Sequence, residues 1–176
     1  KHFNWDKISK TKWFYITSLE GNLDLLEKLI GFAKEDNIKI AFNPGNRELA
    51  QRKKLIPLLK LVDCLFLNKN EAQVLTDIDF DDKDFWPTLI SYSPKIISVT
   101  DGRNGAFVFA DDKHYFSPIV KTKVVDETGA GDAFGSTFIS ALIHKNSPKD
   151  ALFLAMKNSA SVVSRLGSKT GLLTLK

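Results

Sequence analysis

Hydrophobic and polar positions alternate along the first hundred residues in blocks that have the period of strands and helices in turn. Short apolar runs predict buried strands at 13–19, 38–42, 64–67 and 96–100. After the first run, apolar residues recur at helical spacing and predict one buried helix face: Leu23, Leu26, Ile30 and Ala33. Further helices are predicted from about Arg47, with a break or bend near Pro57, and from about Asn70. This alternation predicts a parallel sheet that is covered on both faces.

The pattern changes after residue 100. Segments 106–110 and 114–117 flank Asp111-Asp112 and predict a hairpin, which would place an antiparallel edge on the sheet. Two helices are predicted to follow, at 130–144 and 148–166. The fold class is therefore predicted as α/β, with a doubly wound, mostly parallel, Rossmann-like sheet and an antiparallel hairpin toward one edge. Residues 1–176 are predicted to form a single nucleotide-binding domain.

Composition excludes several classes of protein. Apolar residues make up 43% and charged residues 26%, which is ordinary for a globular domain. No run is long enough for a membrane span, and the N-terminal segment has no signal-peptide pattern. The single cysteine, Cys64, lies in an apolar run, which predicts a core position and fits a cytoplasmic location. The net charge of +4 suits a polyphosphate ligand but is too weak to predict nucleic-acid binding.

The most informative segment is 124–134, where a strand-like stretch ends and a helix begins. Small residues at 129–131 would let a ligand approach the unpaired N–H groups of the first helical turn, which form an anion site. Asp132 lies directly beside this site, where a carboxylate can accept a hydrogen bond and then a proton from an attacking hydroxyl. The alternative is a tight turn in which Asp132 only favours the helix N-terminus.

Two other phosphate-binding motifs fit less well. A dinucleotide fingerprint, G-x-G-x-x-G, requires a third small residue where Phe134 stands, so close packing of helix on strand would fail. A P-loop motif, G-x-x-x-x-G-K-[ST], does not occur in the sequence. A nicotinamide-dependent oxidoreductase is further disfavoured because no acidic residue stands about twenty positions beyond the loop.

The segment resembles the C-terminal signature of the ribokinase-like (PfkB) carbohydrate kinases, and the matching residues are Asp126, Thr128, Gly129, Ala130, Gly131, Asp132 and Phe134. The resemblance implies transfer of a phosphoryl group from ATP to a hydroxyl of a sugar or nucleoside. It implies that Asp132 is the catalytic base and that the amides of 129–132 are the anion hole. It also implies Mg²⁺, and it makes Asp126 and Thr128 candidate ligands of a monovalent cation such as K⁺.

Three further groups of residues follow predicted strands, and each has both a structural and a functional interpretation. Asn68 and Glu71 have the spacing of a helix N-cap and its capping-box partner, and in the resemblance they hold Mg²⁺ through water. Thr100 and Gly102 resemble the family's phosphate turn, or form an ordinary polar turn before the hairpin. Asn43 matches the family's Asn-Pro after the second strand, and is equally well explained as a turn residue.

The end of the chain carries weaker signals. Asn158 is a candidate for lining an adenine pocket, although it lies out of register with the position that the resemblance implies. Gly167 and Gly171 resemble the glycine turn that closes the family's C-terminal part. The resemblance covers nearly the whole chain but only the C-terminal part of the family.

The chain is therefore expected to be a fragment of a longer kinase or to need a partner chain. The identity of the acceptor is left open, and the isolated chain is expected to be inactive. An open sheet edge would favour self-association or a homodimer. The alternative function is a non-catalytic nucleotide-binding or regulatory module.

Overall fold

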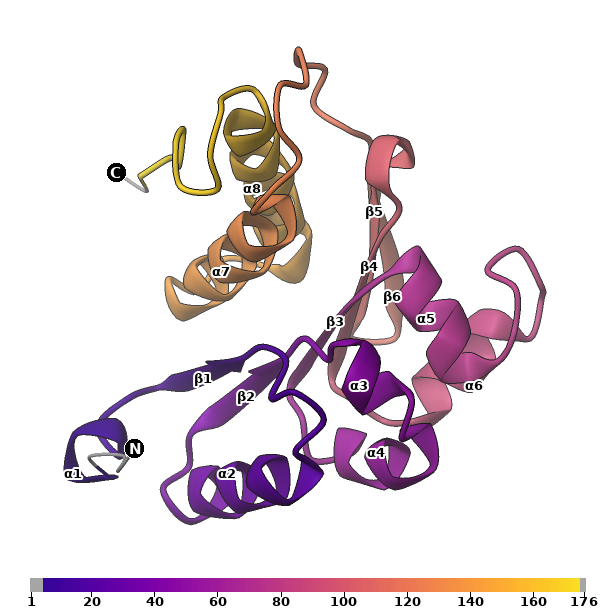
Figure 1. Ribbon diagram of the computed structural model, residues 1–176, viewed down its shortest axis with the longest axis vertical. Coiled ribbons are helices and arrows are strands. Elements are labelled where there is room, and N and C mark those ends of the chain that lie inside the picture. The colour runs from indigo at the N-terminus through magenta and orange to yellow at the C-terminus, as the bar shows by residue number, and fades with distance from the viewer. Residues whose placement is uncertain (1–4, 175–176) are drawn as a thin grey trace. The chain divides into compact units, whose positions relative to one another are not determined.

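The computed structural model describes residues 5–174, and the contacts between residues divide the chain into two compact units, Lys1–Val99 and Thr100–Lys176 (Figure 1). Residues 1–4 and 175–176 lie outside the described part. Six strands form a mostly parallel sheet in the order β1-β2-β3-β4-β5-β6, with β5 and β6 antiparallel. The predicted fold class is confirmed.

The strands of the first unit are β1 (Trp13–Ile16), β2 (Lys39–Phe42), β3 (Cys64–Asn68) and β4 (Ile96–Thr100), the last residue of which begins the second unit. β1 pairs in parallel with β2 and β2 with β3, with Phe42 opposite Leu65. The side chains of 40–42 and 64–67 are buried without interruption, as expected for parallel strands covered on both faces. Cys64 is a buried free thiol, and burial raises its pKa well above the usual range.

The helices of the first unit are α1 (Trp5–Ile8), α2 (Leu23–Glu35), α3 (Asn46–Leu49), α4 (Arg52–Leu59), α5 (Lys69–Thr76) and α6 (Phe85–Ser91). α2 lies against β2 (Figure 1) and buries the four residues predicted for its inner face. It begins at Asn22, whose side chain accepts a hydrogen bond of 2.9 Å from the Leu25 N–H, as expected of an N-cap. The helical pattern therefore predicted the buried face of α2 correctly, whereas the N-cap was not predicted.

The predicted break near Pro57 is wrong. The chain breaks between α3 and α4, at residues 50–51, and Pro57 lies inside α4. A proline costs a helix one backbone hydrogen bond, but its neighbours Leu55 and Leu59 are completely buried on the inner face of the same helix. Packing of these two leucines keeps α4 continuous through Pro57.

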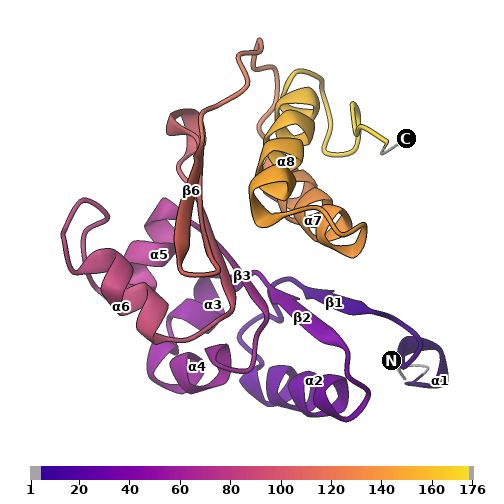
Figure 2. The same cartoon turned by 180° about the vertical axis from the view of Figure 1, so that it is seen from behind.

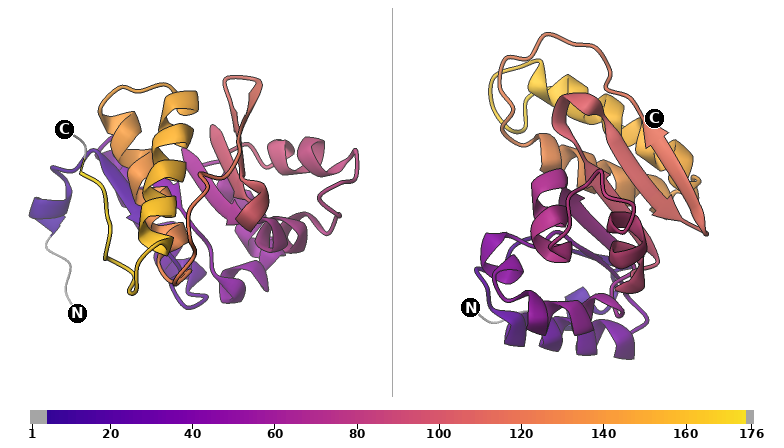
Figure 3. Two further views of the ribbon diagram at one scale, coloured as in Figure 1. Left: turned by 90° about the horizontal axis from the view of Figure 1, so that it is seen from above. Right: turned by 90° about the vertical axis from the view of Figure 1, so that its right-hand side faces the viewer.

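The second unit consists of a short 3₁₀ turn, η1 (Gly102–Asn104), a hairpin of β5 (Ala106–Ala110) and β6 (Lys113–Ser117), and two helices, α7 (Ala130–Ile143) and α8 (Pro148–Val163). The two helices run side by side (Figure 2), and α8 also contacts both strands of the hairpin (Figure 3). α8 starts with Ser147 as its N-cap and Pro148 in its first turn, where a proline fits well. No helix within residues 5–174 has the length and apolar character that crossing a membrane requires.

The prediction of a strand-like stretch before Gly129 is also wrong. Residues 118–127 form no strand, and Val124 and Val125 are exposed. The Val125 N–H instead donates to the Val163 carbonyl at the end of α8, at 2.8 Å. The β-branched residues thus suggested a strand, although this segment bonds to a helix end and has no strand partner. The predicted strand at 13–19 likewise ends early, at Ile16.

Candidate active site

The N-terminus of α7 is built around Gly129, which is the N-cap residue and has a left-handed φ of +83°. A Cβ at this position would lie 2.6 Å from the backbone oxygen of Ser168. Both the backbone conformation and the close approach therefore require glycine here. The predicted glycine-rich helix start is present as a tight turn directly before a helix of 14 residues.

The first amides of α7 are the predicted anion hole. The Ala133 N–H closes the first helical bond to the Gly129 carbonyl at 2.9 Å, and the Ala130 N–H donates to the Glu127 carbonyl at 3.3 Å. By helix geometry, the N–H groups of Gly131 and Asp132 precede the first internal acceptor. Apart from the two chain neighbours and the backbone of the same helix, no described heavy atom lies within 4 Å of the place that a Cβ of Gly131 would take. Gly131 and Asp132 are both exposed, so this part of the helix start is open to solvent.

Asp126 fastens this loop to the turn after α8. One of its carboxylate oxygens accepts the Thr128 N–H at 2.9 Å and the other accepts the Gly167 N–H at 3.0 Å. The hydrogen bonds from the Thr128 side chain and backbone, with that from Gly167, lower the pKa of Asp126. The two candidate cation ligands, Asp126 and Thr128, are therefore brought together, and their visible role is to shape the loop.

Asp132 lies in the first turn of α7 and its side chain is exposed. Within the described part of the chain its carboxylate accepts no hydrogen bond, whereas its backbone carbonyl accepts one from Ser136 Oγ at 2.6 Å. The carboxylate is thus available to a ligand at the helix N-terminus. It contributes little to holding the fold.

The turn of Thr100 and Gly102 lies close to the same loop within the second unit. Gly102 has φ of +49°, and the Asp101 N–H closes the turn on the Gly105 carbonyl at 2.8 Å. Arg103 in this turn places a guanidinium nitrogen 4.0 Å from the Glu127 carboxylate, with both side chains exposed. One exposed ion pair therefore links the predicted phosphate turn to the segment that precedes the glycine loop.

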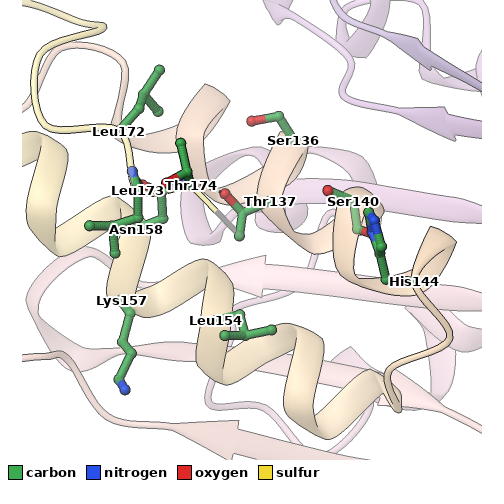
Figure 4. Close-up of a pocket in the computed structure, with 10 residues that line it drawn as sticks. All are labelled: Ser136, Thr137, Ser140, His144, Leu154, Lys157, Asn158, Leu172, Leu173 and Thr174. Atoms are coloured by element: carbon green, nitrogen blue, oxygen red, sulfur yellow. Dashed lines mark hydrogen bonds between the residues drawn. The ribbon is translucent and has the colours of Figure 1, made fainter. Parts of the chain in front are cut away.

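Asn158 lines a pocket of about 420 Å³ between α7, α8 and the C-terminal segment (Figure 4). Its side chain is buried, donates to Thr137 Oγ1 and accepts the Leu173 N–H at 2.7 Å. Apolar and hydroxyl-bearing residues line the pocket, among them Leu154, Leu172, Ser136 and Ser140. Asn158 thus joins the three elements of the pocket wall.

In the first unit, Asn68 and Glu71 form a complete capping box at the start of α5. The Asn68 N–H donates to Glu71 Oε2 at 2.8 Å, and the Glu71 N–H donates to Asn68 Oδ1 at 2.9 Å. Burial raises the pKa of Glu71, although the hydrogen bond from the Asn68 backbone opposes this. Among the described residues Glu71 Oε1 accepts no hydrogen bond. One oxygen therefore serves the cap, and the other remains for a hydrated cation.

Asn43 follows β2 and forms hydrogen bonds to both neighbouring strands, β1 and β3. Its N–H donates to the Ile16 carbonyl at 2.9 Å, and its side-chain amide donates to the Phe66 carbonyl at 3.1 Å. The structure therefore places Asn43 on the carboxyl edge of the sheet, on the strand next to the one that Asn68 and Glu71 follow. Open α/β sheets bind ligands at this edge.

One buried polar residue, Glu48, was not predicted as a site residue. Its carboxylate is completely buried and accepts hydrogen bonds from Leu19, Gly21 and Gly45 N–H groups. Burial alone would raise its pKa, but these bonds and one from Ser18 Oγ lower it overall. The sequence offered only a local signal, a glutamate three residues after the start of a helix.

No group of three or more His, Cys, Asp or Glu side chains within residues 5–174 is arranged to hold a metal ion. The predicted metal and phosphate residues therefore form two sets, one in each unit. In the first unit they are Asn43, Asn68 and Glu71, and in the second they are Thr100, Gly102, Asp126, Thr128 and 129–132.

Comparison with known proteins gives a consistent picture. The sequence profile described as pfkB family carbohydrate kinase matches residues 1–175. A ribokinase of Lactococcus lactis is 29% identical over 171 residues, which cover 96% of this chain and 53% of that protein. A cytidine kinase of Thermococcus kodakarensis is 28% identical over 162 residues, covering 89% of this chain and 56% of that protein.

Among solved structures, an E. coli protein provisionally named Ribokinase II, in complex with ATP and Mg²⁺, matches with a TM-score of 0.83 at 22% identity. The match covers 97% of this chain and 58% of that chain, and at this identity it shows a shared fold. The chain spans about half the length of the curated relatives that it matches.

Proposed function

Because the chain belongs to the pfkB family of carbohydrate kinases, we propose that it binds ATP and Mg²⁺ as part of an enzyme that phosphorylates a sugar or nucleoside hydroxyl. The observation that carries this proposal is the start of α7, where two unpaired amides, open space at Gly131 and an exposed carboxylate, Asp132, adjoin one another. Phosphoryl transfer needs positioning and electrostatic stabilisation more than covalent chemistry from the protein. These groups can supply both.

In the proposed reaction, Asp132 accepts a hydrogen bond from the acceptor hydroxyl, orients the oxygen and takes its proton. The acceptor oxygen bonds to the γ-phosphorus of ATP while the bond from that phosphorus to the bridging oxygen breaks, and ADP leaves with that oxygen. The Gly131 and Asp132 amides, aided by the positive end of the α7 dipole, stabilise charge on the transferring phosphoryl group. Asp126 keeps the loop in shape through its bonds to the Thr128 and Gly167 amides. K⁺ at Asp126 and Thr128 is a further part of the proposal, since each carboxylate oxygen retains a second lone pair.

Glu71 is proposed to hold Mg²⁺ through water, with Asn68 fixing its position. The donor set fits this ion, because magnesium prefers oxygen ligands and keeps several of its waters. When bound, the ion would supply positive charge to the phosphates. Asn43, Thr100 and Gly102 are proposed to line the phosphate path at the strand ends.

The pocket beside Asn158 is proposed to take the adenine base. Its volume of about 420 Å³ and its mixed apolar and hydroxyl lining suit a planar heterocycle. Since both ends of the Asn158 amide are already bonded within the wall, this residue would shape the pocket more than read the base.

The proposal is tested by incubating the full-length protein with Mg-ATP and a panel that includes D-ribose, D-fructose, cytidine and adenosine. We expect ADP and one phosphorylated acceptor in equal amounts, measured by mass spectrometry. Binding of ATP without transfer to any acceptor would instead favour the non-catalytic nucleotide-binding module. Absence of ATP binding would refute both.

Glu71→Gln separates the two interpretations of the capping box. Glutamine can still accept the Asn68 N–H, so the free energy of unfolding should change by less than about 1 kcal/mol. Loss of the negative charge should raise the Mg²⁺ concentration for half-maximal rate about fivefold or more. Because the pKa of Glu71 is raised, the wild-type requirement for Mg²⁺ should also increase as the pH falls toward that pKa. An unchanged metal requirement combined with lost stability would leave Glu71 as a cap alone.

A further inference from the structure

The buried carboxylate of Glu48 connects two segments at the carboxyl ends of neighbouring parallel strands. Glu48 Oε1 accepts the N–H groups of Leu19 at 2.7 Å and Gly21 at 2.8 Å, in the loop after β1. Glu48 Oε2 accepts the Gly45 N–H at 2.8 Å, in the turn after β2, and Ser18 Oγ at 3.0 Å. One side chain thus fixes both segments, which we call the ledge (residues 18–21 and 44–45).

The arrangement is costly unless the carboxylate is fully bonded. A buried charge is strongly destabilising without hydrogen-bond partners, and Glu48 has no exposed surface. Its hydrogen-bond partners among the described residues are neutral amides and a hydroxyl, without a cation among them. An apolar side chain would fill the same space without this requirement. The carboxylate is therefore suited to fixing backbone amides in place rather than to filling the core.

The ledge is tightly packed and strained. A Cβ on Gly45 would lie 2.6 Å from Ser18 Oγ, and a Cβ on Gly21 would lie 3.0 Å from Arg47 Cβ. Glu20, between the two amides held by Glu48, has a left-handed φ of +57°. Strain of this kind in a residue other than glycine often marks a functional segment.

The position of the ledge along the sheet edge indicates that it serves the acceptor rather than ATP. Glu71, proposed for magnesium, follows β3, whereas the ledge follows β1 and β2 on the same carboxyl edge. The residues proposed for magnesium and the phosphates follow β2, β3 and β4, so the end of β1 is the part of this edge that is left for the acceptor. The exposed surface of the ledge is polar there, with the Glu20 carboxylate 2.8 Å from Arg47, and charged side chains suit the recognition of hydroxyl groups.

We propose that Glu48 is a positioning residue for the acceptor: it holds the ledge in the geometry that binds a polyhydroxylated substrate. The proposal rests on the proposed kinase function. Glu48 itself is buried and touches no substrate. It acts through the backbone amides of Leu19, Gly21 and Gly45.

The test uses Glu48→Gln with Asp63→Asn as the matched control. Glutamine keeps the size of Glu48, but its NH₂ group would face a backbone donor. Asp63 is another buried carboxylate of the same unit, which accepts the Ile40 N–H at 2.9 Å and Lys95 Nζ at 2.7 Å, just before β3 begins. It therefore lies at the amino edge of the sheet, away from the ledge. Both variants remove one buried negative charge.

The readouts are amide hydrogen exchange and steady-state kinetics of the full-length protein with D-ribose or cytidine as acceptor. In Glu48→Gln, exchange at Leu19, Gly21 and Gly45 should accelerate at least tenfold while the strand amides of β2 and β3 stay protected. KM for the acceptor should rise at least fivefold and KM for Mg-ATP should stay within twofold. Asp63→Asn should leave both KM values within twofold, even if its Tm falls by the same amount.

Two outcomes would overturn the proposal. Unchanged exchange at Leu19, Gly21 and Gly45 would show that Glu48 does not hold the ledge. Equal changes in the two KM values, or the same kinetic change in Asp63→Asn, would show a general loss of stability. If the wild-type protein phosphorylates neither probe, the kinetic comparison uses the acceptor that the wider panel identifies. If the panel yields none, the proposed function and the acceptor role fail together, while the exchange data still decide whether Glu48 holds the ledge.

Discussion

Asp132→Asn should lower the turnover of the full-length enzyme by about 100-fold or more, because general-base catalysis typically contributes at least that much. Asparagine has nearly the same shape and retains an oxygen that can accept a hydrogen bond, but it cannot take the proton. Since the side chain is exposed and its carboxylate accepts no hydrogen bond within the described part of the chain, the fold and the affinity for Mg-ATP should be kept. The measurements are kcat, Tm and Mg-ATP titration by calorimetry.

The chain offers a matched control for this variant. Asp150 holds the same place in the first turn of α8 that Asp132 holds in α7, three residues after the N-cap. It is bonded to its own cap, Ser147 Oγ, at 2.6 Å. Asp150→Asn should therefore lower stability slightly and leave kcat unchanged. Turnover of Asp132→Asn within threefold of the wild type would remove Asp132 from the mechanism and return it to the role of a helix-end charge.

The sequence predicted those parts of the fold whose determinants are local. The face of α2 was predicted correctly because Leu23, Leu26, Ile30 and Ala33 follow the helical period and all point to the core. The buried strands were found because uninterrupted apolar runs of this length suit a sheet covered on both faces. The capping box of Asn68 and Glu71 was predicted from a spacing of three residues, and both of its hydrogen bonds are present.

The errors have tertiary causes. Pro57 did not break α4, because the burial of Leu55 and Leu59 outweighs one lost backbone bond. Val124 and Val125 suggested a strand, yet the acceptor of the Val125 amide is the end of a helix 38 residues further along the chain. No property of the local sequence indicates such a partner.

The parts of the candidate site were predictable to different degrees, depending on whether their residues are close together in the sequence. The glycine loop and Asp132 are contiguous, so their chemistry was apparent from spacing. The hydrogen bond between Asp126 and the Gly167 N–H joins residues that are 41 positions apart in the sequence. The hydrogen bonds of Glu48 to the loop after β1 join residues that are 27 to 30 positions apart. A glutamate at the start of a short helix is ordinarily exposed, so its complete burial depends on a fold that brings amides to it.

The second large effect is expected at the glycines of the α7 start, where two substitutions should separate folding from binding. Gly129→Ala places a Cβ at φ of +83° and 2.6 Å from the Ser168 oxygen. Such a residue is strained in any case, so the free energy of unfolding should fall by about 1–3 kcal/mol. The loop must shift, and the affinity for Mg-ATP should fall with it.

Gly131→Ala should behave differently. Apart from its chain neighbours and the backbone of its own helix, its Cβ meets no described heavy atom within 4 Å. Gly131 lies inside the helix, where alanine is more favourable than glycine by roughly 0.5–1 kcal/mol. Stability should therefore stay the same or rise. The added methyl would, however, fill the space through which a phosphate reaches the Gly131 and Asp132 amides. Weakening of hydrogen bonds to a charged group costs about 1.5 kcal/mol or more, so Mg-ATP affinity should fall at least tenfold.

Gly31→Ala is the control, because Gly31 is also helical, with open space around its would-be Cβ, but lies in α2. It should gain stability without any change in Mg-ATP affinity. The three variants and the wild type are compared by thermal unfolding and by calorimetric titration with Mg-ATP. A Gly131→Ala variant that is as stable as Gly31→Ala, yet binds Mg-ATP at least tenfold more weakly, would assign the open space to the ligand. Wild-type affinity in Gly131→Ala would mean that no phosphate binds at the start of α7, and the proposed anion hole would have to be abandoned.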